Sequence, residues 1–357
     1  MVTNDVVTVI RDGTVAVVWI DNPPVSALSR NVRQGMLEAF QQLHHDRSLE
    51  VIVISARIGG RFIAGTDIRE MDRPVEEFFL PDVTDALDRL PQKTLAAIDG
   101  SALGGDMEIA LACDVRMGSP SATLGLTESR LGIIPGAGGT QRLARLVGIP
   151  QAIRLIVEGR ILRAAEAVEL GLLDHIADGN LVQRAIEIAP VVAKRRLSEQ
   201  PVPIVDPSEQ KKAITAAFKK AKSKAAADEA VRVLSLSSDM SFEEGLASER
   251  DAFLRLREGP EAKALRTCSK RSEKQAKFRV WRMQGLGPFS GSPSLAVAPW
   301  ASGLLQAFWM QVSRSISLNE TTHLLSQPAR GCMTYTSAES KQDVWLKKMP
   351  TGGSDVI

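Results

Sequence analysis

A glycine pair that opens a helix stands next to two acidic residues in the stretch GSALGGDMEIALACD, residues 100–114. Gly104 and Gly105 form a small, turn-prone segment, and the apolar residues behind them recur at helical spacing. A glycine turn that opens a helix leaves backbone N–H groups free to hold an anion. Asp106 follows the pair directly and would compete with such an anion. Glu108 lies among apolar neighbours, which is an unusual setting for a carboxylate.

A second glutamate and a second glycine turn extend this pattern. Glu128 follows Glu108 by twenty positions, in the loop-like stretch GLTESRLGIIPGAGGT, and the other turn is RFIAGTD at residues 61–67. Two carboxyl groups in different environments can divide the work of a general acid and a general base. Taken alone, each glutamate would be an ordinary charge and the glycine pair a tight turn. Only the joint pattern predicts an active site.

The other motifs in the chain offer no competing chemistry. GAGGTQ, residues 136–141, imitates a dinucleotide-binding fingerprint, but glutamine replaces the final glycine and no strand directly precedes it, so we interpret it as a helix-opening turn. The four histidines are scattered, and no serine or cysteine stands in a recognisable nucleophile setting. The three cysteines lack metal-site spacing, so we expect unpaired thiols and no bound metal.

Composition and charge argue against nucleic-acid and membrane partners. The chain has 357 residues, 44% of them hydrophobic and 24% charged, with a net charge of +2. These values are typical of a globular protein and give no attraction to nucleic acid or to an anionic membrane. No window holds the roughly 18 apolar residues that a membrane span needs. The first residues lack the basic and apolar segments of a secretory signal, so we expect a reducing, cytoplasmic location.

Strand and helix patterns alternate over residues 1–190 and predict an α/β domain with largely parallel strands. VVTVIRDGTVAVVWID indicates a β-hairpin around Asp12-Gly13, and Ser29 is expected to cap the next helix with its side chain. Residues 191–278 read as a linker segment of Ala/Lys/Glu-rich amphipathic helices behind a proline-bearing connector. Residues 279–357 show no sustained periodicity and are expected to be a disordered tail.

Residues 14–190 resemble the crotonase superfamily, the enoyl-CoA hydratases and isomerases. The motifs that carry the resemblance are FIAGTDIREM, ALGGDMEIALACD, LGLTESRLGIIPGAGGTQRL and EAVELGLLD. NPPVSALS, the connector RRLSEQPVP and the helices behind it resemble, more narrowly, the N-terminal hydratase part of bifunctional enzymes that also carry a 3-hydroxyacyl-CoA dehydrogenase. The resemblance covers residues 1 to about 278. It implies a crotonase-like spiral of ββα units.

The resemblance also implies roles for individual residues. Glu108 and Glu128 would be catalytic and hold a water molecule between them, with Glu108 activating the water and Glu128 exchanging the Cα proton. The backbone N–H groups of Ala64 and Gly105 would form an oxyanion hole, in which the loss of one donor typically costs about 10²–10³ in rate. The residues implied in binding the acyl-CoA substrate are Ser26, Ala27, Ala64, Gly65, Thr66, Asp67 and Gly104.

Asp106 departs from the family pattern, in which a third glycine is usual. An acid in the first turn of a helix gains about 0.3–1 kcal/mol from the helix dipole. A carboxylate about 5 Å from a developing enolate would cost on the order of 3 kcal/mol at an effective dielectric constant of about 20, or roughly a hundredfold in rate. The penalty shrinks if the side chain turns toward solvent, and the sequence leaves that alternative open.

Three functions are compatible with the sequence. The first is an enoyl-CoA hydratase of fatty acid β-oxidation, which adds water to trans-2-enoyl-CoA and gives 3-hydroxyacyl-CoA. The second is an isomerase that moves the double bond of an enoyl-CoA from C3 to C2, for which one well-placed glutamate suffices. The third is a catalytically impaired protein that binds CoA thioesters. Each of the three is compatible with a homo-oligomer.

The tail from Arg279 is expected to be an out-of-frame remnant of a dinucleotide-binding domain. The bifunctional family places such a domain here, yet no glycine fingerprint appears. Starting each codon of SGSPSLAVAPWA, Ser290 to Ala301, on its third base permits RIAVV followed by GGGTMG, a strand running into a glycine turn. We therefore expect neither NAD binding nor dehydrogenase activity, and no cofactor beside the acyl-CoA substrate.

Overall fold

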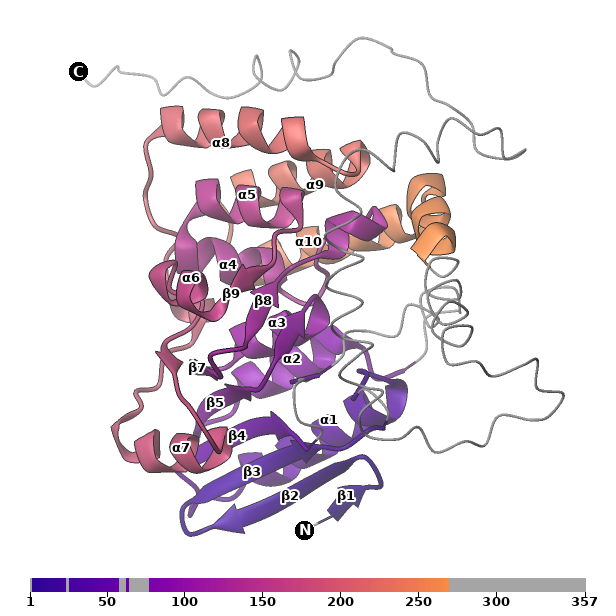
Figure 1. Cartoon of the computed structure of the whole chain (residues 1–357). Helices are drawn as coiled ribbons and strands as arrows, with labels where there is room; N and C mark the ends of the chain where they lie inside the picture. The colour runs from indigo at the N-terminus through magenta and orange to yellow at the C-terminus, as the bar shows by residue number, and fades with distance from the viewer. Residues whose placement is uncertain (1, 24–25, 58–61, 64–76, 270–357) are drawn as a thin grey trace, which may run out of the picture. The chain divides into compact units, whose positions relative to one another are not determined.

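The computed structural model describes residues 2–23, 26–57, 62–63 and 77–269 (Figure 1). Met1–Ser269 form a compact unit of their own. Its described part holds a seven-stranded sheet in the order β1-β2-β3-β4-β5-β7-β10 and a three-stranded sheet in the order β6-β8-β9. The strands are β1 (Val2–Asn4), β2 (Val7–Asp12), β3 (Val15–Ile20), β4 (Val51–Ala56), β5 (Lys93–Ile98), β6 (Ser101–Leu103), β7 (Val115–Gly118), β8 (Thr123–Gly125), β9 (Leu162–Arg163) and β10 (His175–Ile176).

Helices connect these strands, and further helices follow the last strand in the chain. Residues 260–269 are also helical. The α-helices are α1 (Arg30–His44), α2 (Leu80–Asp88), α3 (Gly105–Ala112), α4 (Gly139–Val147), α5 (Ile149–Glu158), α6 (Ala164–Glu169), α7 (Leu181–Ile188), α8 (Pro207–Lys220), α9 (Lys224–Ser235) and α10 (Phe242–Glu258), and short 3-10 helices are η2 (Glu128–Leu131), η3 (Ala189–Val191) and η4 (Leu197–Glu199).

The hairpin predicted around Asp12 and Gly13 is confirmed. β2 and β3 pair antiparallel up to the pair Asp12↔Val15, and Gly13 has the positive φ of 58° that this tight turn requires. The strands β3, β4, β5, β7 and β10 then pair in parallel. This is the α/β arrangement that the alternation of strand and helix patterns predicts.

Helix α1 begins directly after Ser29, but the predicted capping bond is absent. Ser29 occupies the N-cap position without a capping hydrogen bond from its side chain. Its Oγ accepts a hydrogen bond from Nδ2 of Asn22 at 3.3 Å instead. The prediction was wrong because a side-chain donor in the preceding loop competes for the same oxygen. α1 packs against β1, β2 and β3, with Met36 and Phe40 buried on its apolar side.

The central parallel strands bury one of their faces under α7. Strand alternation points Val17, Val53 and Leu95 to the same side of the sheet, where they form an apolar cluster with Leu181 and Ala185 of α7. Parallel strands are usually covered on both faces and read as continuous apolar runs. The first five residues of β4 are accordingly all buried. The sheet is therefore a rigid support for the loops that leave its strand ends.

Helix α3 carries the glycine pair and two buried acids. It follows β6 directly in the chain, and β8 pairs in parallel with β6. All eight residues of α3 are buried, and these include Asp106 and Glu108. A helix that is mostly apolar on every side belongs in a core. The surrounding residues therefore carry both carboxyl groups into the interior.

Helices α8, α9 and α10 confirm the helical character predicted for the segment behind residue 190. α8 and α9 pack against α5, and α10 packs against α4 and α9 (Figure 1). The side chains of Asp206, Ser223 and Ser241 cap these three helices. The boundaries at 190 and 278 stay predictions. The predicted tail, residues 279–357, lies outside the described residues.

Within the described ranges, no helix is long and apolar enough to cross a membrane. The same residues include no group of three or more His, Cys, Asp or Glu side chains that could hold a metal ion. Cys113 at the end of α3 is buried and makes no disulfide. Burial raises the pKa of its thiol to about 12, so this cysteine is an inert core residue.

Candidate active site

Gly104 and Gly105 stand where β6 turns into α3. Gly104 has φ 62° and ψ −126°, a conformation that is open almost only to glycine, and its N–H donates to the carbonyl of Gly125 at 2.9 Å. Gly105 is the first residue of α3, so its N–H has no acceptor within the helix. The positive end of the helix dipole reinforces this donor. The Gly105 N–H is therefore suited to stabilise an oxyanion.

The carboxyl group of Glu128 lies beside this glycine pair. Glu128 opens η2, and a Cβ atom added at Gly104 would stand 3.3 Å from its Oε1. Both carboxyl oxygens are buried, and neither has a hydrogen-bond partner among the described residues. Buried polar atoms are nearly always satisfied. The exception at Glu128 leaves this carboxyl group available to a ligand, as an active-site acid requires.

Glu108 is held by the turn that begins α4. Its Oε1 accepts hydrogen bonds from the N–H groups of Ala137 at 2.7 Å and Gly139 at 3.0 Å. A Cβ atom added at Gly139 would stand only 2.9 Å from that oxygen, so glycine permits the close approach. N–H donors at a helix start favour the ionised form of a carboxylate. The GAGGTQ motif is thus the helix-opening turn that the sequence predicts, and it holds an internal carboxylate.

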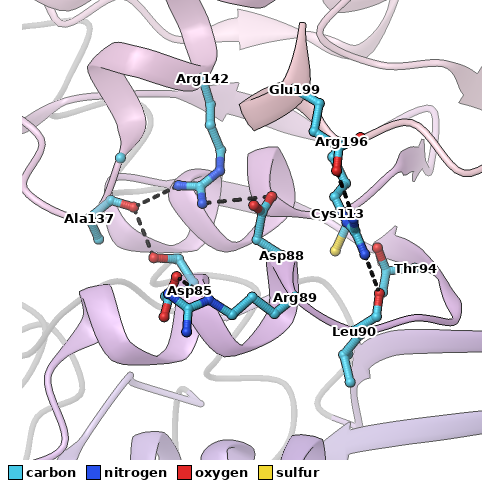
Figure 2. A network of polar contacts seen from close by, with 12 residues as sticks. Asp85, Asp88, Arg89, Leu90, Thr94, Cys113, Ala137, Arg142, Arg196 and Glu199 are labelled. Carbon is cyan, nitrogen blue, oxygen red and sulfur yellow. Dashed lines mark hydrogen bonds and ion pairs between the residues drawn. The ribbon is translucent and has the colours of Figure 1, made fainter. Parts of the chain in front are cut away.

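The peptide at Ala137 is fixed from its carbonyl side as well. The carbonyl oxygen accepts from Nη1 of Arg142 at 3.1 Å and from Oγ1 of Thr84 at 3.0 Å. Figure 2 shows the Arg142 guanidinium between Ala137 and Asp88, and its Nη2 lies 3.8 Å from the Asp88 carboxylate. These contacts orient the peptide so that its N–H donates to Glu108.

Sequence reasoning missed Glu249, a second buried carboxyl group at this turn. It comes from α10 and accepts from the N–H groups of Gly138 at 2.5 Å and Thr140 at 2.7 Å. The Thr140 hydroxyl also donates to it at 2.5 Å. Glu108 and Glu249 therefore take alternate N–H groups of residues 137–140. α10 thus locks the turn on which Glu108 depends.

The surroundings separate the pKa values of the three carboxyl groups. Burial raises the pKa of Glu128 well above its usual value, and the charge of Glu108 raises it further. Burial also raises the pKa of Glu108, but the N–H groups of Ala137 and Gly139 oppose that rise. Burial and the charge of Glu108 raise the pKa of Glu249 to about 8. Both pKa values are raised, and that of Glu128 is raised well above its usual value, so of the two predicted residues Glu128 is better suited to donate a proton and Glu108 to accept one.

Asp106 lies in the interior and not in solvent. Its exposed fraction is 1%, which excludes the solvent-facing alternative that the sequence left open. Its charge is among the causes that raise the pKa of Glu128, after burial, Glu108 and Glu249. The negative charge of Asp106 therefore acts on the site.

The structure brings Gly104, Gly105, Glu108 and Glu128 together, as the sequence predicts, and places Ser26 and Ala27 in the loop between β3 and α1. Ser26 has a φ of 51°, unusual for a serine, and its buried hydroxyl has no partner among the described residues. Its N–H donates to the carbonyl of Asn22 at 2.7 Å. The other predicted site residues, Ala64, Gly65, Thr66 and Asp67, lie outside the described residues.

The model of the enoyl-CoA hydratase/isomerase family matches residues 11–254 of this chain. The chain belongs to that family. This membership confirms the resemblance to the crotonase superfamily and the fold class that the motifs predict.

Relatives in the hydratase/isomerase family match different shares of the chain. The peroxisomal bifunctional enzyme of Homo sapiens is 32% identical over 307 residues, which are 82% of this chain and 42% of the human protein. The mitochondrial methylglutaconyl-CoA hydratase of Mus musculus is 40% identical over 161 residues, which are 43% of this chain and 51% of the mouse protein. The chain spans less than half the length of the bifunctional relatives that it matches.

Solved structures of hydratases share the fold. The enoyl-CoA hydratase of Bacillus anthracis is 30% identical with a TM-score of 0.50, over 71% of this chain and 92% of that structure. The enoyl-CoA hydratase of Mycobacterium avium subsp. paratuberculosis K-10 is 22% identical with a TM-score of 0.54, over 74% of this chain and 96% of that structure, and shows the fold alone.

Proposed function

We propose that this chain is an enoyl-CoA hydratase of fatty acid β-oxidation, which adds water to trans-2-enoyl-CoA and yields 3-hydroxyacyl-CoA. One observation supports this most: two buried carboxyl groups with unlike surroundings meet beside the glycine pair. Glu108 accepts from two N–H donors, whereas the Glu128 oxygens have no partner among the described residues. Membership of the hydratase/isomerase family supports a reaction in which such a pair is useful.

Water addition needs a base, an acid and a donor to the thioester oxygen. Ionised Glu108 takes a proton from water while the water oxygen bonds to Cβ, and the electrons of the double bond move toward the thioester oxygen. The Gly105 N–H stabilises the negative charge that develops there. The second donor that the resemblance implies, at Ala64, lies outside the described residues.

Protonation at Cα completes the addition. Protonated Glu128 delivers its proton to Cα as the enolate collapses to the thioester. The step leaves Glu108 protonated and Glu128 ionised, so one proton transfer between them restores the starting state. The balance is one water molecule added across the double bond.

The other two functions stay in competition because of specific observations. An isomerase needs only one carboxyl group to move a proton, and the oxygens of Glu128 have no partner among the described residues. Asp106, buried close enough to affect the pKa of Glu128, favours a protein that binds CoA thioesters but turns them over slowly. A spectrophotometric assay with crotonyl-CoA tests the proposal, because hydration removes the absorbance of the conjugated thioester.

Gly104→Ala is expected to lower stability and hydration together. The strained backbone costs an L residue on the order of 1–3 kcal/mol, and the added methyl group would crowd the Glu128 carboxyl group. Gly13→Ala is the matched control, because Gly13 also has a positive φ, 58°, but no atom lies within 4 Å of an added Cβ. Urea unfolding and crotonyl-CoA turnover check both variants. Full activity in Gly104→Ala would remove Gly104 from the site.

The chain is expected to lack dehydrogenase activity, in line with the proposed out-of-frame tail. Titration calorimetry with NAD should give no heat of binding, and 3-hydroxybutyryl-CoA with NAD should give no NADH. Sequencing of the gene tests the reason. A coding sequence without a dehydrogenase-like frame downstream of codon 278 would contradict the out-of-frame origin, and NADH formation would contradict the missing activity.

A further inference from the structure

A pocket of about 230 Å³ adjoins the turn that holds Glu108. This volume is below the roughly 300–1,000 Å³ of typical ligand pockets, so the pocket suits one end of a ligand. It lies between α2, the turn and α10. Its lining residues that matter here are Thr84, Ala137, Gly138, Leu246, Glu249 and Arg250.

Arg250 brings a guanidinium group to the wall of this pocket. The group lies over the rings of Phe79 and Phe253, at 5.6 and 5.2 Å from their centroids. In the part of the chain that the structure describes, it makes no hydrogen bond and no ion pair. Two aromatic faces hold the guanidinium by cation–π contact and leave its five N–H donors for another partner.

The acids near Arg250 are already engaged elsewhere. Asp82 accepts from the N–H of Phe79 at 3.0 Å, and Asp85 pairs with Arg89 at 3.1 Å. The two glutamates of the turn, Glu108 and Glu249, accept from its N–H groups. Among the described residues no acid forms an ion pair with the guanidinium, so its donors can bind a ligand, and a planar guanidinium matches a carboxylate with two parallel hydrogen bonds.

We propose that this pocket receives the far end of the acyl group and that Arg250 binds a carboxylate carried there. The preferred substrates are then short 2-enoyl-CoA thioesters of dicarboxylic acids. This inference rests on the proposed function, in which Glu108 acts at Cβ. Because the pocket shares Ala137 and Gly138 with the turn that holds Glu108, we place the part of the acyl chain beyond Cβ there. Leu246 offers the intervening methylene groups an apolar contact.

Two substrates of equal chain length test the proposal, hex-2-enedioyl-CoA with a terminal carboxylate and hex-2-enoyl-CoA without one. Arg250→Gln is expected to lower kcat/KM for the dicarboxylic substrate by about 10- to 100-fold, since a charge-assisted hydrogen bond contributes about 1.5–3 kcal/mol. For the neutral substrate we expect a smaller loss, because the Arg250 charge also lowers the pKa of Glu108 and its removal affects both substrates. Arg255→Gln is the matched control, because Arg255 lies on the same helix, half exposed, and pairs with Glu229 and Asp251. An equal loss for both substrates would overturn the proposal.

Binding measurements separate this inference from the proposed function. Titration calorimetry compares adipoyl-CoA with hexanoyl-CoA, neither of which has a double bond to hydrate. Tighter binding of adipoyl-CoA that is lost in Arg250→Gln and kept in Arg255→Gln supports the carboxylate site even if no hydration occurs. Equal binding of the two thioesters by the unmodified chain overturns the carboxylate site even if the chain proves to be an active hydratase.

Discussion

Replacement of Glu108 or Glu128 by Gln is expected to lower kcat for crotonyl-CoA hydration by at least about a hundredfold, within the 10²–10⁴ that acid–base catalysis typically contributes. Gln keeps the shape of the side chain and removes its ionisable proton. In Glu108→Gln the amide oxygen can still accept from the N–H groups of Ala137 and Gly139. In Glu128→Gln no described hydrogen bond is lost. The loss therefore reports on chemistry and not on folding.

The two variants also separate hydration from isomerisation. A C3-to-C2 isomerisation needs only one carboxyl group, which in its ionised form takes the proton from Cα and then returns it at C4. With Glu128 as that group, isomerisation should survive in Glu108→Gln and disappear in Glu128→Gln. Glu187→Gln is the control for a charge removed elsewhere, because Glu187 is an exposed residue of α7 paired with Arg184. Near-normal hydration by either active-site variant would refute the role assigned to that residue.

Removal of the Asp106 charge is expected to speed hydration by between about tenfold and a hundredfold. The buried carboxylate opposes the negative charge that develops at the thioester oxygen, and a cost of on the order of 3 kcal/mol corresponds to roughly a hundredfold. Asp106→Asn removes the charge and keeps the size, whereas Asp106→Gly restores the residue usual in the family. The glycine variant should also be slightly less stable to heat, because it loses the dipole interaction and gains backbone entropy in the unfolded chain.

The pH profile gives Asp106 a second readout. Glu128 donates a proton, so kcat falls as the pH rises through its pKa. The charge of Asp106 helps to raise the pKa of Glu128, and without that charge the pKa falls. Asp106→Asn should therefore move the alkaline limb of the kcat profile to lower pH while raising the plateau. An unchanged plateau would contradict the cost assigned to the Asp106 charge, and a lower plateau would show that the Asp106 side chain contributes to catalysis.

The glycine turn and its two glutamates could be predicted because their signals are local. The glycine pair, the apolar run and the spacing of Glu108 and Glu128 all lie within residues 100–140. The burial of Asp106 could not be predicted, since it depends on the packing of α2 and α4 against α3. A sequence shows that an acid follows a glycine pair, but it does not show which neighbours cover that acid.

The places of Glu249 and Arg250 near the site could not be predicted for a different reason. The hydrogen bond from Gly138 to Glu249 spans 111 positions, and no local pattern records such a contact. The sequence does carry one weak trace of it: Glu249 shares the buried stripe of α10 with Gly245 and Ala252, where an acid is out of place. The stripe predicts that this side of α10 is buried, but it does not predict that the turn at residues 137–140 packs there.

The central claim is that this chain adds water to a 2-enoyl-CoA with Glu108 as base and Glu128 as acid. Incubation of the full chain with crotonyl-CoA, followed by identification of the product, tests it most directly. The account predicts loss of the conjugated thioester absorbance and formation of 3-hydroxybutyryl-CoA. Binding of crotonyl-CoA without any product would contradict the claim and would leave a CoA-thioester-binding protein in its place.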